Sequence, residues 1–304
     1  MQKGDPKIIK AWTMYDWANS SYSLTITSAV FPMFYVAITT LDGIDMVDDR
    51  YGIPASSLYS YALSAGFLLV ALIIPLLSGI ADHRGNKLSY LKAFCYIGAV
   101  SCAGLAFFSL DHLWIGLLCV VLACAGFSGS LVFYDAYLPE IAEPSDHDRI
   151  SARGYTMGYL GSVLLLILNL VMILTWPDKA WPARVSFVSV AIWWAGWAQW
   201  PFNVLRDREG VPIAVVGNGA LWSGYQELRK VWRQLMHMRR LTRFLAAFFV
   251  LNMGIQTVMY LAVNFAKQEI KQTDGSPISD SSLIISVLVI QLVAALGAFA
   301  FVKL

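Results

Sequence analysis

The sequence predicts an all-α, polytopic membrane protein, and three observations support this fold class. Hydrophobic residues make up 58% of the 304 positions and charged residues only 14%, whereas about 25% of the residues in soluble domains are charged. Eight runs of 18 to 31 residues contain no Asp, Glu, Lys or Arg, and a helix of about 20 apolar residues crosses a bilayer. These long runs also differ from the short alternating segments of a β-barrel, the other spanning architecture.

The positions of these runs predict eight transmembrane helices. They lie near residues 14–39, 58–81, 92–110, 113–134, 154–175, 184–205, 243–265 and 282–302. The first run is too long for a signal peptide and begins beside an acid, so we expect it to be retained as a helix. The N-terminus, the loops after the second, fourth and sixth helices and the C-terminal end hold 17 of the 22 Lys and Arg residues. This bias predicts that both termini are cytoplasmic, and we expect a bacterial inner membrane as the location.

The spacing of the runs predicts three parts. Residues 1–205 would form a six-helix bundle, residues 206–242 a cytoplasmic linker, and residues 243–304 the first two helices of a second bundle. Transporters with this arrangement have two six-helix halves. We therefore expect a C-terminally truncated chain with eight of twelve helices, with missing helices supplied in trans as the alternative.

The linker contains a segment with amphipathic spacing. Apolar residues recur at helical intervals beside a strongly basic remainder, and they are Leu221, Trp222, Tyr225, Leu228, Trp232 and Leu235, with Arg229, Lys230, Arg233, Arg239 and Arg240. Such a helix is expected at the inner membrane surface, with its cations toward anionic lipid. A plain solvated linker is the alternative.

The loop after the second predicted helix carries a recognisable motif. It reads SGIADHRGNKLSYLK over residues 78–92 and resembles the signature Gly-x-x-x-Asp-Arg-x-Gly-Arg-Lys of the major facilitator superfamily. Asp82, Gly85 and Lys87 match that pattern. Ser78, His83 and Asn86 depart from it, while Arg84 keeps a cation close to the expected place.

Further stretches narrow the resemblance to one branch of that superfamily. They are YDWANSSYSLTITSAVFPMFY at 15–35, FYDAYLPEIA at 133–142, SARGYTMGYLGS at 151–162 and LNMGIQTVMYLAVNFA at 251–266. Together they resemble the vacuole-effluxer family, which is related to autophagy-linked amino-acid exporters. The resemblance implies a secondary transporter that works by alternating access and exports amino acids or similar small solutes. The substrate does not follow from it, because this fold hosts many cargoes.

Seven charged residues at the cytoplasmic ends of the helices are candidates for gating or ion coupling: Asp16, Asp82, Lys87, Asp135, Glu140, Arg149 and Arg153. Asp16 follows Lys10 by six residues, or about 9 Å of helix, so it is expected near the interface. It is either a first-turn acid complementing the helix N-terminus or a gate or proton-coupling group paired with Arg153 or Lys87. The acids after the fourth helix would form an ion-pair network with Arg149 and Arg153, or be solvated.

Polar side chains deeper in the spans are candidates for solute binding, namely Asn19, Asn252, Gln256 and Gln291. Hydrogen bonding between helices is the alternative role for each of them. Asn252 and Gln256 are four residues apart and so share a helix face. Uncharged amides of this kind can bind amino or carboxyl groups, so we expect these two to contact a small-molecule substrate.

Other classes of protein are less consistent with the sequence. GFSGS at 126–130 matches the Gly-x-Ser-Gly of intramembrane serine proteases, but all four histidines fall in loops, so a catalytic base is missing and packing explains the small residues better. Motifs for metal, ATP or dinucleotide binding are absent. We expect no catalytic residues, metal, cofactor or nucleic-acid partner. A truncated, non-transporting sensor or scaffold remains an alternative.

Overall fold

A computed structural model describes residues 2–177, 180–207, 220–271 and 278–301. Nearly all of these residues are helical. The helices are α1 (Pro6–Ser21), η1 (Tyr22–Val30), α2 (Phe31–Thr39), α3 (Met46–Tyr51), α4 (Ala55–Arg84), α5 (Lys87–Gly104), η2 (Leu105–Phe107), α6 (Leu113–Asp135), α7 (Leu138–Ile141), η3 (Pro144–Asp146), α8 (His147–Thr175), α9 (Ala180–Val204), α10 (Ala220–His237), α11 (Arg239–Glu269) and α12 (Asp280–Phe301). The all-α prediction is therefore confirmed.

In each of the eight ranges that the sequence predicts to be transmembrane, most of the described residues are helical, and the third range is helical as far as Phe107. Among the described residues, six helical segments are long and apolar enough to cross a bilayer. They are Pro6–Thr39, Ala55–Ala81, Lys87–Phe107, Leu113–Ile141, Pro144–Thr175 and Arg239–Val263. The helix α9 is not among them, and the apolar part of α12, Ser282–Gly297, is shorter. The count of eight spans, and of twelve in a complete protein, stays a prediction.

The first span is a continuous helix with a π-helical middle. It begins at Pro6, where the side chain of Asp5 accepts a hydrogen bond from the N–H of Lys7 at 2.8 Å. In the middle segment η1 the turns widen, and the N–H of Phe31 donates to the carbonyl of Ile26, five residues back. Proline lacks an N–H and crowds the carbonyl four residues before it. The wider turn therefore accommodates Pro32 without ending the span.

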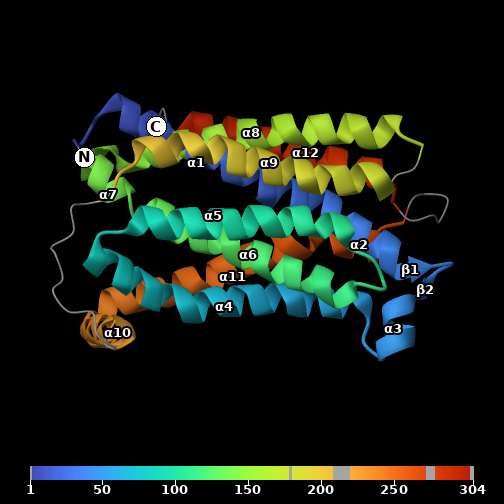
Figure 1. Ribbon diagram of the computed structural model, residues 1–304, viewed down its shortest axis with the longest axis horizontal. Helices are drawn as coiled ribbons and strands as arrows, with labels where there is room; N and C mark the ends of the chain where they lie inside the picture. Colours follow the sequence, from blue (N-terminus) through green and yellow to red (C-terminus); the bar gives the residue numbers. More distant parts are fainter. Residues whose placement is uncertain (1, 178–179, 208–219, 272–277, 302–304) are drawn as a thin grey trace.

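The long helices run side by side along the long axis (Figure 1). In this view α1, α8, α9 and α12 form one side, α4 and α11 lie on the other, and α5 and α6 lie between them. Large buried aromatic side chains fill the interior, including Trp12, Trp194, Tyr15 and Phe31. Where α5 meets α6 the backbones touch, because a Cβ on Gly126 would lie 2.5 Å from the Cα of Gly98. This contact supports helix packing as the role of the small residues at 126–130.

The two ends of the bundle differ. The start of α1, the short α7 and the helix α10 lie at one end, and α3 with the hairpin of β1 (Thr40–Leu41) and β2 (Ile44–Asp45) lies at the other (Figure 1). Figure 1 looks almost along the axis of α10, so this helix runs across the long helices. On its described part, Val231, Trp232 and Met236 are exposed, as is Arg233. Of its predicted apolar stripe, the side chains of Leu221, Trp222, Tyr225 and Leu228 lie outside the described part.

Candidate functional site

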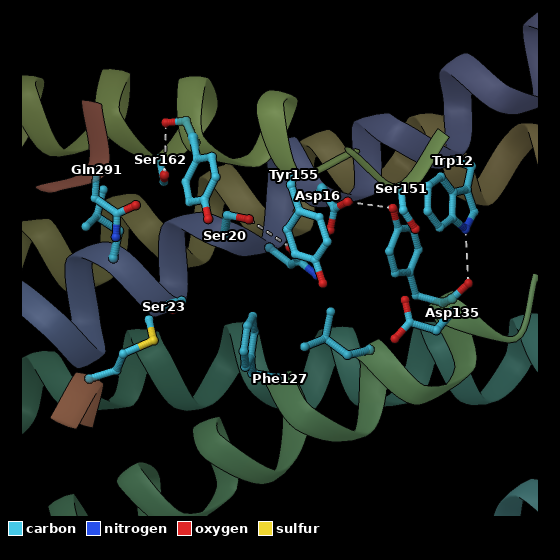
Figure 2. Close-up of a pocket in the computed structure, with 16 residues that line it drawn as sticks. Trp12, Asp16, Ser20, Ser23, Phe127, Asp135, Ser151, Tyr155, Ser162 and Gln291 are labelled. Carbon is cyan, nitrogen blue, oxygen red and sulfur yellow. Dashed lines mark hydrogen bonds between the residues drawn. The ribbon is translucent and has the colours of Figure 1, made fainter. Parts of the chain in front are cut away.

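A polar pocket of about 220 Å³ opens between the helices near the α7 end of α1. Its walls come from six elements, and the lining residues are Trp12, Asp16, Asn19, Ser20, Ser23, Leu24, Phe127, Leu131, Tyr134, Asp135, Ser151, Tyr155, Tyr159, Ser162, Met259 and Gln291. We call it the polar pocket. Figure 2 shows Gln291 and Ser23 toward one end of it and Trp12 and Asp135 toward the other.

The local helix geometry explains why these side chains converge. Trp12, Asp16, Asn19, Ser20 and Ser23 follow one another at intervals of one to four residues, which places them along one stripe of the first span. On α8, the residues Ser151, Tyr155, Tyr159 and Ser162 repeat the same spacing. The two stripes face each other, because α1 and α8 pack closely along their length.

Three glycines allow this close approach of α8 to α1. A Cβ on Gly154 would collide with Oδ2 of Asp16, and one on Gly158 would collide with the hydroxyl of Ser20. A Cβ on Gly161 would lie 2.7 Å from the carbonyl oxygen of Trp17. Small residues let helix backbones approach in a bilayer. These three glycines therefore set the distance between α1 and α8, which form two walls of the pocket.

Asp16 is the buried acid of the pocket, with 8% of its surface exposed. The hydroxyl of Tyr134 on α6 donates a 2.7 Å hydrogen bond to its Oδ2. The ring of Tyr134 in turn stacks on Trp12 with centroids 4.3 Å apart, and the indole N–H of Trp12 donates to the carbonyl oxygen of Tyr134 at 3.0 Å. Thus Asp16 is held by an aromatic pair that bridges α1 and α6.

The expected cation partners of Asp16 lie elsewhere. Lys87 forms a 2.8 Å ion pair with Glu140, and Arg153 is exposed on α8. Within the described residues, no Lys, Arg or His lies within ion-pair distance of Asp16 or Asp135. The packing of α8 over α1 buries Asp16 within the protein. Its position near the membrane interface, expected by counting residues from Lys10, stays a prediction.

Asn19 is another buried polar group of the pocket, with 1% of its surface exposed. Its Oδ1 accepts a 3.4 Å hydrogen bond from the hydroxyl of Ser20. Its Nδ2 has no partner in the described structure. A buried N–H without a partner costs free energy, about 1 to 3 kcal/mol. Such a donor is therefore a candidate for contact with an acceptor on a ligand.

The four amide residues predicted to bind solute line two different cavities. Asn19 and Gln291 line the polar pocket, whereas Asn252 and Gln256 line a second cavity of about 450 Å³ between α4 and α11. The walls of this second cavity include Ser60, Leu63, Phe67 and Tyr260 and are mainly apolar. Asn252 and Gln256 do share a face of α11, as expected, but that face lines the cavity beside α4 and does not line the polar pocket.

A cluster of charged and polar groups ties three helix ends together near the polar pocket. The Lys87–Glu140 pair joins the start of α5 to α7, and its side chains are 16% and 15% exposed. Oδ1 of Asp207, just past α9, accepts a 2.7 Å hydrogen bond from the N–H of Leu88 and a 3.3 Å bond from the hydroxyl of Tyr137. We call Lys87, Glu140, Tyr137 and Asp207 the helix-end cluster.

The other predicted gating residues lie around this cluster. Arg149 pairs with Asp146, three residues before it, at 2.8 Å, and both side chains are largely exposed. Asp82 lies in the last turn of α4, before Gly85 ends the helix with φ of 69°, and its side chain is outside the described part. Among the acids that follow α6, Glu140 pairs with Lys87, Glu143 pairs with Lys3 and Asp146 pairs with Arg149.

Several residues of the polar pocket and of the helix-end cluster were not predicted from the sequence. Tyr134, Tyr155 and Tyr159 line the polar pocket, and Asp207 belongs to the helix-end cluster. The tyrosines recur at helical spacing within predicted spans, which indicates a shared face but not a pocket. Asp207 is an acid next to Arg206 at a predicted cytoplasmic helix end, on the same side as Lys87. Their common position on the predicted cytoplasmic side is the only sequence feature that pointed to a contact between Asp207 and the start of α5.

The fold and the pocket together define a class of protein. A multi-pass helical bundle with a polar pocket among its helices is typical of membrane transporters. The solved structure of the major facilitator superfamily proton:xylose symporter XylE superimposes with a TM-score of 0.59 and 15% sequence identity, covering 98% of this chain and 68% of that one. The chain therefore has the major facilitator fold.

The family can be stated more closely. The sequence model of the family described as "Vacuole effluxer Atg22 like" matches residues 4–304, and the chain belongs to this family. It is 29% identical to the uncharacterized MFS-type transporter YxiO of Bacillus subtilis, over all of this chain and 69% of that protein. Autophagy-related protein 22 of Pyricularia oryzae is 22% identical over 87% of this chain. The chain spans about half the length of the fungal relatives it matches.

Proposed function

We propose that this protein is a secondary transporter that moves a small solute, an amino acid, across the membrane by alternating access, and that the polar pocket binds the solute. The main support is the composition of the pocket. It combines a buried carboxylate, Asp16, with an amide N–H of Asn19 that lacks a partner. An amino acid offers an ammonium group and a carboxylate, the two complements of these groups.

The position of the pocket supports alternating access. Fourteen of its sixteen lining residues belong to residues 1–205, and the other two are Met259 on α11 and Gln291 on α12. The pocket thus lies between the predicted first bundle and the start of the second. Rocking of two bundles about such a site would expose it to each side of the membrane in turn.

The helix-end cluster is the proposed latch of one conformational state. Its half-buried Lys87–Glu140 pair and the bonds of Asp207 hold the ends of α5, α7 and α9 together. Asp16 is the proposed coupling carboxylate, with a proton as the coupling ion. Interfaces with two alternative sets of ion pairs are a common basis of switching.

We propose export as the direction and a bacterial inner membrane as the location, with both termini in the cytoplasm. The family description "vacuole effluxer" supports export, and the bacterial relative supports the location. The basic residues of α10 and of the neighbouring helix start also favour the cytoplasmic side at this end of the bundle. The helix α10 would lie on anionic lipid there, with Trp232 toward the headgroups.

Flux measurements test the proposal. The chain is reconstituted in liposomes of mixed neutral and anionic lipid, loaded with unlabelled solute, and presented with a panel of labelled amino acids and sugars at two pH values. Saturable counterflow of at least one amino acid is expected, and it should fall in Asp16→Asn while membrane insertion is unchanged. Absence of flux for every solute would contradict the proposal. Binding without flux would instead favour a non-transporting sensor.

A further inference from the structure

The charge of the polar pocket is unbalanced. Asp16 and Asp135 both line it, and the other fourteen lining residues are neutral. Asp16 has the Tyr134 hydroxyl as its hydrogen-bond donor, and no described cation pairs with Asp135. Two carboxylates that share a site without a cation repel each other. A positively charged ligand would relieve this repulsion, and a neutral ligand would not.

The rest of the lining suits an organic cation. No group of three or more His, Cys, Asp or Glu residues among the described part of the chain could hold a metal. The walls present the aromatic rings of Trp12, Phe127, Tyr155 and Tyr159 instead, and aromatic faces attract organic ammonium groups. The serine hydroxyls of α1 and α8 add acceptors for N–H groups.

A second, independent feature points to a ligand oxygen. Nδ2 of Asn19 is buried and has no partner, so it requires an acceptor that the protein does not supply. A carboxylate or carbonyl oxygen meets this need. Asn19 precedes the Ser20 hydroxyl by one position and follows Asp16 by three, so the donor and the acid lie on the same stripe of α1.

From these features, and building on the proposed amino-acid transport, we propose that the polar pocket selects a solute with net positive charge that also carries a carboxylate, the chemistry of a basic amino acid. One ammonium group lies against Asp16 and a second against Asp135. The carboxylate lies against the Asn19 amide. A neutral amino acid leaves one of the two acids without a cation. Because Asp135 is exposed and its charge is partly screened, the expected discrimination is about tenfold.

Binding affinities of a series of related ligands for the unaltered chain test this charge selectivity. Lysine and norleucine share a backbone and a side chain of equal carbon number, and they differ in the terminal ammonium. Isothermal titration in detergent micelles should give a dissociation constant for lysine at least tenfold lower than that for norleucine or for lysine acetylated on its side-chain nitrogen. Cadaverine, which lacks the carboxylate, should bind more weakly than lysine.

Variants assign the selectivity to named groups. Asp135→Asn should bring lysine and norleucine within threefold of each other, and Asn19→Ala should weaken lysine binding but leave cadaverine binding unchanged. The matched control is Asp146→Asn, which removes an exposed acid outside the pocket and should preserve the tenfold preference. Monodisperse elution of each variant from a size-exclusion column shows that it is folded. The comparison of ligands is made on the unaltered chain and does not depend on any variant.

The outcomes separate this proposal from the proposed function. Equal affinity for lysine and norleucine, or a preference that survives in both Asp16→Asn and Asp135→Asn, would overturn the charge selectivity and leave amino-acid transport standing. Saturable flux of sugars alone, with no amino acid bound, would overturn both. Lysine-selective binding that Asp135→Asn removes would support the charge selectivity, and saturable counterflow of lysine would support the proposed function as well.

Discussion

The hydroxyl of Tyr134 on α6 lies 2.7 Å from Oδ2 of Asp16 on α1 and donates a hydrogen bond to it. Both side chains are almost completely buried. This bond joins helices whose contacting residues are 118 positions apart, at the edge of the polar pocket. It fixes the direction of the one buried carboxylate of the pocket.

Tyr134→Phe should therefore destabilise the protein. The ring can keep its stacking on Trp12, but Asp16 loses its donor, and hydrogen bonds to charged groups contribute about 1.5 to 3 kcal/mol. We expect a lower melting temperature in detergent and weaker solute binding. Tyr61→Phe is the control, since Tyr61 is 63% exposed on α4. Equal melting temperatures for the two variants would show that the bond contributes little.

Gly154→Ala should disturb Asp16 directly. The added methyl group would collide with the carboxylate, and overpacking costs about 1 to 3 kcal/mol. Gly196 on α9 has no atoms within 4 Å of its missing Cβ. Gly196→Ala should leave stability unchanged or raise it by up to about 1 kcal/mol, because alanine favours helix. Thermal unfolding of both variants measures whether each substitution lowers or raises stability. A destabilised Gly196→Ala with an unaffected Gly154→Ala would contradict the close approach of Gly154 to Asp16.

The half-buried ion pair of the helix-end cluster should matter more than the exposed one nearby. Glu140→Gln removes the charge that meets Lys87 at 2.8 Å, and we expect a loss of about 1.5 to 3 kcal/mol. Asp146→Asn removes the exposed partner of Arg149 and should cost less than about 1 kcal/mol. Reversal of the pair in Lys87→Glu with Glu140→Lys should restore part of the stability. Chemical unfolding of the four chains gives the comparison, and equal effects of the two single variants would contradict it.

The two cavities predict different effects for similar amides. Gln291 lines the polar pocket and Gln256 lines the cavity between α4 and α11. If solute binds in the polar pocket, Gln291→Leu should weaken solute affinity by up to about tenfold, as expected for one lost hydrogen bond of at most about 1.5 kcal/mol. Gln256→Leu should change it less than twofold. A larger effect at Gln256 would place the solute beside α4.

The sequence was sufficient for the helices and for part of the site. Charge-free runs locate spans because the cost of burying charge in lipid is local to each segment. Asp16, Asn19, Asp135 and Gln291 were found as polar groups in or beside such runs. Their grouping was not predictable, because it depends on how each helix is rotated against its neighbours. The same rotation turned Asn252 and Gln256 toward α4 and gave Asp16 a tyrosine instead of a cation.

The missed residues have a common physical reason. A tyrosine in a span satisfies the hydropathy pattern, so Tyr134 gives no signal until its hydroxyl is seen beside an acid. Asp207 likewise looks like an ordinary loop acid until the fold brings it to the N–H of Leu88, 119 positions earlier. Pairings between distant segments are set by tertiary packing, which local sequence patterns describe poorly.

The π-helical stretch before Pro32 carries one further implication. Its turns hold more residues than those of an α-helix, so it sets the angular offset between the half of the span that bears Asp16 and Asn19 and the half that follows Pro32. A shift of this stretch toward regular α-helical turns would rotate the first half about its own axis while Pro32 stayed in place. The side chains of Asp16 and Asn19 would then move around the axis of α1 and change their positions relative to α8.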